Sequence, residues 1–152
     1  MIVDLIQILS RYGTSTVEEL KRSIQPYSAT GDTIKSLRFM VTREGTIDKL
    51  QVLGRAFIMA LETGRKATPQ YTKPSFAFVD RIRRWLAAKG EETRPAYAIA
   101  KSIHQKGTKG HPGVVSNVVN DTLINTISKD ILQQFAKQYM FNVVQFTSGK
   151  FN

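Results

Sequence analysis

The spacing of hydrophobic side chains along the first part of the chain is helical. Residues 2–12 carry apolar side chains three and four positions apart, and Gly13 follows as a natural stop. A second helix is expected from Ser15 or Thr16, because both residues begin a capping-box spacing. Pro26 ends this second helix. The pattern predicts two consecutive helices, followed by a turn with a short helical segment.

The spacing then changes to the two-residue period of half-buried strands. Residues 36–42 alternate apolar and polar side chains, residues 44–46 supply a turn, and residues 47–53 return as a second strand. This pattern predicts a β-hairpin. Residues 55–64 could form a third strand or a short helix, and their alanines and methionine favour the helix. Residues 65–75 form a proline-bearing connector.

Helical spacing returns in the second half of the chain. From Ser75 to Lys89, one half of the helical wheel is apolar, and Asp80 and Arg84 face each other on the opposite half. The apolar half consists of Phe76, Phe78, Val79, Ile82, Trp85 and Leu86. The next helix opens at Thr93 and Pro95 and ends at Gly107. Its narrow stripe of small side chains suits close packing, and its members are Ala96, Ile99, Ala100 and Ile103.

A long final helix is expected from about Asn117 to Tyr139. Its main stripe is Ile124, Ile127, Ile131 and Phe135. The β-prone segment "FNVVQFT" after it favours a further strand in the hairpin sheet. The fold class predicted is α+β, a small antiparallel sheet packed against several α-helices, in a single domain of residues 1–152.

Composition narrows the class of protein. The chain has 152 residues with 41% hydrophobic and 22% charged side chains, as in ordinary globular proteins. Cysteine is absent, which excludes disulfides, thiolate nucleophiles and cysteine-ligated metals. No apolar run is long enough to span a membrane, and residues 1–13 lack the features of a secretory signal. We therefore expect synthesis in the cytoplasm and no membrane partner.

Positive charge is concentrated in one third of the chain. The net charge is +10, and residues 65–110 hold eleven Lys or Arg against three Asp or Glu. A basic segment of this kind attracts an acidic partner, either nucleic acid or the carboxylates of another protein. A solvated basic surface is the plainer interpretation.

The segment "AKSIHQKGTKGHPG", residues 100–113, is the one stretch that suggests chemistry. A phosphate-binding P-loop needs Gly-Lys-Ser/Thr between a strand and a helix, whereas here Gly107, Gly110 and Gly113 are three apart and follow a helix. The glycines are therefore interpreted as conformational: a helix cap, then a Pro-Gly turn that reverses the chain and holds its lysines outward.

The sequence offers no candidate residues for metal binding or for catalysis. His104 and His111 are the two histidines, and neither has a carboxylate within seven positions. His104 lies at the border of an apolar stripe, where a satisfied side chain is expected in place of a ligand. Carboxylates lie mostly in caps, turns and helix faces, without a pair or a nucleophile suited to acid–base work. The sequence predicts no cofactor, no metal and no enzymatic activity.

The order of several short motifs resembles a known family. Pro26 precedes Thr30-Gly31 and a hairpin; "ETGRK" follows the hairpin; "WLAAKG" ends a helix; and "AYAIAKSIHQKGTKG" leads to the long last helix. This series, over roughly residues 20–140, is similar to the tail-completion or head–tail joining proteins of tailed bacteriophages, the minor-tail (Z-like) group. Family members often place aromatics after the Gly-Thr-x-Gly loop, where this chain has "HPGVVSN".

The resemblance implies a structural virion protein with no catalytic role. Such a subunit forms a homo-oligomeric ring at the neck or tail, around the channel through which the genome leaves. Its partners are copies of itself and adjacent portal, connector or tail proteins, and non-specific contact with genomic double-stranded DNA stays open. The basic side chains are then the expected interface: Arg65, Lys66, Lys73, Arg81, Arg84, Lys106 and Lys109. The alternative is a small basic accessory protein that binds DNA non-specifically.

Overall fold

The computed structural model describes residues 4–69 and 72–148, with side chains as far as residue 140. Within these residues the fold is α+β, with six α-helices and short antiparallel strands, which confirms the predicted class. Contacts divide the chain into two compact units. One combines the residues up to Glu18, the segment Arg38–Val52 and the chain from Val119; the other contains Glu19–Leu37 and Leu53–Val118.

Helix α1 (Leu5–Ile24) is one continuous helix where the sequence predicts two. The predicted stop at Gly13 is wrong, and packing explains why a glycine lies inside this helix. A Cβ on Gly13 would come within 3.0 Å of side-chain atoms of Phe39 and Leu50. The helix therefore continues through Gly13, whose bare backbone lets the hairpin side chains approach. Pro26 ends α1 as predicted, within a 3-10 turn, η1 (Gln25–Tyr27).

Replacing Gly13 with alanine tests this packing. On helix propensity alone the change stabilises a helix interior by about 1 kcal/mol. Here we expect a net loss of about 1–2 kcal/mol in the free energy of unfolding, because the new methyl group displaces Phe39 and Leu50. Chemical denaturation measures the difference. Thr14→Ala is the matched control, because Thr14 is the next residue of the helix and is exposed. A Gly13→Ala protein that is more stable than the unaltered protein would contradict the close packing.

The hairpin is formed as predicted by β1 (Arg38–Glu44) and β2 (Ile47–Leu53). Gly45 lies in the two-residue turn with a φ of 62°, a conformation that favours glycine. Arg43 donates to the Asp48 carboxylate at 2.7 Å and 2.9 Å near the turn. This hydrogen bond lowers the pKa of the Asp48 carboxyl.

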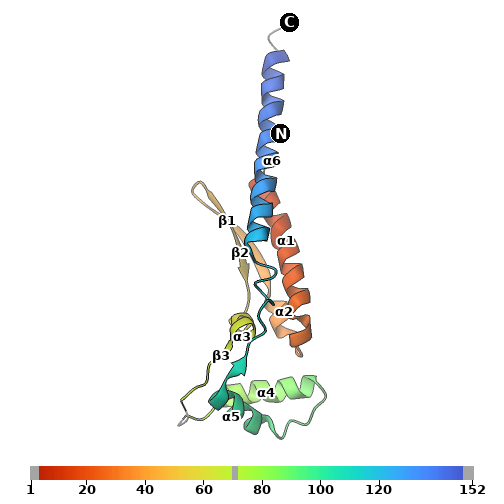
Figure 1. Ribbon diagram of the computed structural model, residues 1–152. Coiled ribbons are helices and arrows are strands. Elements are labelled where there is room, and N and C mark those ends of the chain that lie inside the picture. Colours follow the sequence, from red (N-terminus) through yellow and green to blue (C-terminus); the bar gives the residue numbers. More distant parts are fainter. Residues whose placement is uncertain (1–3, 70–71, 149–152) are drawn as a thin grey trace. The chain divides into compact units, whose positions relative to one another are not determined.

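Helix α6 (Asp121–Ser148) is longer than predicted and begins about four residues later. Asn120 caps it by accepting a hydrogen bond from the Leu123 amide at 3.0 Å. The predicted C-terminal strand is wrong, because residues 141–147 belong to this helix. Each residue added to an existing helix gains a hydrogen bond without a new nucleation cost, which outweighs the β propensity of valine and phenylalanine. Figure 1 shows α6 as an uninterrupted helix.

The second unit contains the short helices and the basic segment. It holds η1, α2 (Asp32–Ser36), α3 (Phe57–Thr63), β3 (Gly64–Arg65), α4 (Phe76–Ala88), α5 (Ala96–Lys106) and β4 (Thr108–Lys109). The predicted helical turn after Pro26 and the helix preferred for residues 55–64 are both confirmed. The two strands, β3 and β4, were not predicted.

Helices α4 and α5 pack against each other through small and branched side chains. Their buried cluster consists of Val79, Leu86, Ala96 and Ala100, with Phe78, Ile82, Trp85 and Ile99 packed around it. The narrow stripe on α5 thus packs as predicted. Ser75 caps α4 by accepting from the Phe78 amide, and Arg84 pairs with Asp80 at 2.7 Å. The assignment of Phe76 to the apolar face is wrong, because its side chain is 79% exposed in the first turn.

Candidate functional site

A short ladder in the second unit joins segments more than forty residues apart. Strand β3 pairs antiparallel with β4, so that Gly64 lies opposite Lys109 and Arg65 opposite Thr108. The ladder joins the two motifs "ETGRK" and "GTKG". Two-residue strands are too short to show a hydrophobic period, and for this reason the sequence pattern did not reveal them.

Three glycines make the ladder possible. A Cβ on Gly64 would overlap the backbone of Thr108 and Gly110; one on Gly107 would overlap Arg65 and Ala67. Gly64 and Gly107 also have φ values of 81° and 73°, which other residues rarely adopt. A Cβ on Gly110 would overlap the backbone of α3's last turn. The predicted conformational role of Gly107 is confirmed, and its closest contact is backbone-to-backbone.

The carboxylate of Glu62 holds the turn that follows the ladder. It accepts hydrogen bonds from the amides of Gly113 at 2.9 Å and Val115 at 2.7 Å, and from the Ser116 hydroxyl at 2.6 Å. The His111 amide bonds the Leu61 carbonyl at 2.7 Å beside it. The donated hydrogen bonds, led by that of Ser116, lower the pKa of Glu62 from 4.5 to about 2. Glu62 therefore stays ionised and fixes the outgoing chain.

His104 anchors the connector to the end of α5. Its ring Nε2 lies 2.8 Å from the Thr72 hydroxyl, and its carbonyl accepts from the Thr68 amide at 2.8 Å. The side chain is buried, which agrees with the predicted satisfied histidine. In the part of the chain that the structure describes, no three His, Cys, Asp or Glu side chains gather as metal ligands.

Four of the seven predicted interface residues gather at the ladder. Arg65 and Lys109 belong to its two strands, and a close backbone approach places Lys66 beside Gly107, the residue after Lys106. Arg65 is half-buried as a residue, and its guanidinium carbon lies 4.5 Å from the centre of the Phe78 ring, a cation–π distance. The other three side chains are exposed. We call Arg65, Lys66, Lys106 and Lys109 the basic ladder site.

The three ladder lysines contribute exposed positive charge to the basic ladder site. Among the described residues none of their ammonium groups forms an ion pair. Lys66 lies two positions after Gly64, the ladder partner of Lys109, so these two lysines share one face of the ladder.

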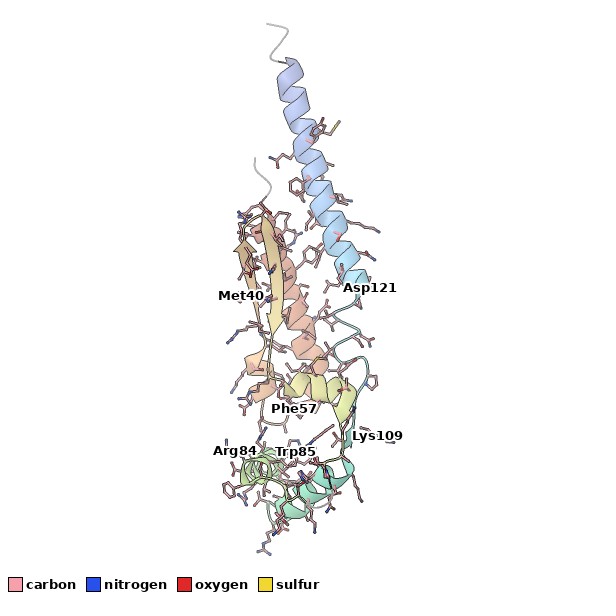
Figure 2. All side chains as sticks on the ribbon, turned by 90° about the vertical axis from the view of Figure 1, so that its left-hand side faces the viewer. Met40, Phe57, Arg84, Trp85, Lys109 and Asp121 are labelled. Carbon is pink, nitrogen blue, oxygen red and sulfur yellow. The ribbon has the colours of Figure 1, made fainter. Side chains whose placement is uncertain are left out.

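The remaining three predicted residues lie elsewhere in the same unit. Lys73 is exposed in the connector, and Arg81 and Arg84 are exposed on α4. Arg84 is already paired with Asp80, and Figure 2 shows Arg84 on α4 and Lys109 on β4. Phe78, which stacks on Arg65, is one turn before Arg81 on the same helix. Sequence reasoning had no signal for the Glu62 contacts, because they depend on residues more than fifty positions away.

Comparison with protein-family models, with curated proteins and with solved structures finds no match to this chain. No helix in the described residues has the length and apolar character needed to cross a bilayer. The resemblance to phage tail-completion proteins therefore rests on its sequence motifs.

Proposed function

We propose that this protein is a structural virion subunit of a tailed bacteriophage, a ring-forming head–tail connector or tail-completion component. The observation that carries the proposal is the β3–β4 ladder. Two of the motifs in the resemblance, "ETGRK" and the end of "AYAIAKSIHQKGTKG", contain the segments that pair there. Motifs that contact each other in the folded protein support the resemblance better than motifs that share only their order along the chain.

The basic ladder site suits docking on an acidic protein surface. Backbone pairing, glycine contacts and the Glu62 carboxylate hold its segments in place, so little conformational freedom is lost on binding. Its lysines supply the positive charge that steers an acidic partner and sets its orientation. We favour contact with an adjacent ring over contact with passing DNA, because a strongly basic channel would retain the genome and slow its exit.

Charge reversal at the ladder tests the proposal. The double variant Lys66→Glu/Lys109→Glu, supplied in trans to a phage genome that lacks this gene, should enter particles at least tenfold less than the unaltered chain. Quantitative mass spectrometry of purified particles measures the incorporation. Lys35→Glu is the matched control, because Lys35 is an exposed lysine of α2 in the same unit, away from the ladder. Circular dichroism should show that all three proteins are folded.

Two outcomes would change or end the proposal. If particles incorporate the double variant normally but eject DNA poorly, we would infer that these lysines line the channel and do not contact an adjacent ring. Absence of the unaltered protein from infectious particles would refute a virion role.

The exposed lysines also favour a second candidate, a non-specific DNA-binding accessory protein. Such a protein should bind free duplex with an affinity that falls steeply as salt rises, since each phosphate contact releases counterions. A ring subunit should show little salt-sensitive affinity for duplex DNA. Fluorescence anisotropy at several salt concentrations separates the two candidates.

A further inference from the structure

Helix α6 has a half-buried mixed face and an exposed apolar face between Asp121 and Met140. One face is half-buried and packs within its own unit; its members are Leu123, Ile127, Asp130, Gln134 and Gln138. On that face Asp130 pairs with Arg11 and accepts from the Tyr12 hydroxyl of α1 at 3.2 Å. The other face, about a quarter turn away, is largely open to solvent. We call it the α6 stripe, and it consists of the exposed Ile124, Leu132, Phe135 and Tyr139, with the half-buried Ile131 at its edge.

The α6 stripe is more apolar than an ordinary solvated helix face, with Ser128 as the one polar position along it. Four of its side chains are strongly exposed: Ile124 57%, Leu132 67%, Phe135 47% and Tyr139 70%. Together these four present roughly 500 Å² of side-chain surface, since large side chains carry about 200 Å² each. Soluble proteins rarely leave a patch of that size uncovered unless a partner binds there.

The charges on the helix argue for a protein partner. The stripe contains no Lys or Arg, so phosphates of nucleic acid or of anionic lipid find no cation on it. Residues 121–140 contain two lysines and two aspartates, a net charge of zero, whereas residues 65–110 carry eight excess positive charges. Two copies of this helix segment can therefore pack together without net electrostatic repulsion, although the chain as a whole is very basic.

The spacing of the stripe fits a second helix of the same kind. Ile124 and Ile131 are seven positions apart, as are Leu132 and Tyr139, which is the repeat of helices that pack along their length. Two copies of the stripe would bury about 1,000 Å² in total, close to the lower bound for a specific interface. An interface of this size predicts weak, concentration-dependent association of two chains.

We propose that the α6 stripe is a self-association surface whose occupant is α6 of a second copy of this chain. The inference deepens the proposed function and rests on it for its setting: the stripe-to-stripe contact is two-fold and pairs two subunits, whereas a ring also needs a second, head-to-tail contact between neighbours. In this arrangement the basic ladder site contacts an acidic neighbouring protein, and the α6 stripe contacts another copy of this chain.

Sedimentation of the purified full chain over a range of concentrations tests this. The unaltered chain should shift from monomer to oligomer as concentration rises into the micromolar range. The double variant Leu132→Gln/Phe135→Gln should raise the dissociation constant at least tenfold while leaving the melting temperature unchanged. Phe76→Gln is the matched control, an exposed aromatic side chain of α4 outside the stripe, and should associate like the unaltered chain.

Crosslinking supplies an independent measurement, because the chain has no native cysteine. Ser128 lies within the stripe, four positions from both Ile124 and Leu132, and Gln133 lies on the far side of α6; both positions are exposed and suit Ser128→Cys and Gln133→Cys variants. A short bismaleimide should join two Ser128→Cys chains and leave Gln133→Cys chains largely single. Equal crosslinking of the two variants would overturn the proposal, as would an unaltered chain that stays monomeric at millimolar concentration. Stripe-dependent binding to anionic vesicles without self-association would also overturn it.

The two proposals can fail separately. Self-association through the stripe in a protein that never enters phage particles would refute the virion role and keep the inference. Incorporation into particles by the Leu132→Gln/Phe135→Gln variant at unaltered copy number would refute the inference and keep the virion role.

Discussion

Replacing Gly107 with alanine is expected to destabilise the second unit by roughly 3–5 kcal/mol, the sum of a strained backbone and a steric overlap. Gly107 has a φ of 73°, and a Cβ there would overlap the carbonyl of Arg65. Because the atoms in the way belong to backbone paired in the ladder, rotation of a side chain cannot relieve the overlap. Thermal denaturation followed by circular dichroism measures the loss, and the ladder should open first.

Two further glycines separate the causes of this loss. Gly90 has a φ of 74° with nothing within 4 Å of its would-be Cβ, so Gly90→Ala reports backbone strain alone, about 1 kcal/mol. Gly110→Ala reports overlap alone, because Gly110 lacks a positive φ yet faces the backbone of Glu62, Thr63 and Gly64. If Gly107→Ala costs no more than Gly90→Ala, the interlocked ladder does not exist in solution.

The second large effect is expected at Glu62. In Glu62→Gln one carboxylate oxygen becomes an amide nitrogen, which donates and cannot accept from the backbone or hydroxyl donors on that side. We expect a loss of about 2 kcal/mol near neutral pH, since hydrogen bonds to an ionised group contribute more than neutral ones. Urea denaturation of both proteins measures the difference. Glu91→Gln is the matched control, because Glu91 is an exposed glutamate of the same unit.

The Glu62 contribution has a defined pH dependence. The pKa of Glu62 is lowered from 4.5 to about 2 in the folded protein, so folding favours its ionised form. Its stabilisation is complete above pH 4.5 and declines as the pH falls from there towards 2. The difference in unfolding free energy between the unaltered protein and Glu62→Gln should therefore shrink across that interval. A difference that stays constant from neutral pH to pH 2 would show that the carboxylate is not held by these donors.

The pattern of neighbouring residues along the chain was enough to predict most of the helices and the hairpin. The hairpin, α3, α4, α5 and the ends at Pro26 and Gly107 depend on periodicity, caps and turn residues, which act over a few positions. The concentration of charge in residues 65–110 was also evident, since it requires only counting. Seven candidate interface residues followed from it, without their arrangement in space.

Contacts between distant residues decided the rest. Gly13 stops no helix because Phe39 and Leu50 pack over it, and residues 141–147 continue α6 because an existing helix extends more easily than a new strand forms. The ladder, the glycine overlaps and the Glu62 hydrogen bonds join residues forty to fifty positions apart, and two-residue strands leave no periodic signal. The sequence shows which side chains are available. Which distant residues they contact is decided by the packing of the whole unit.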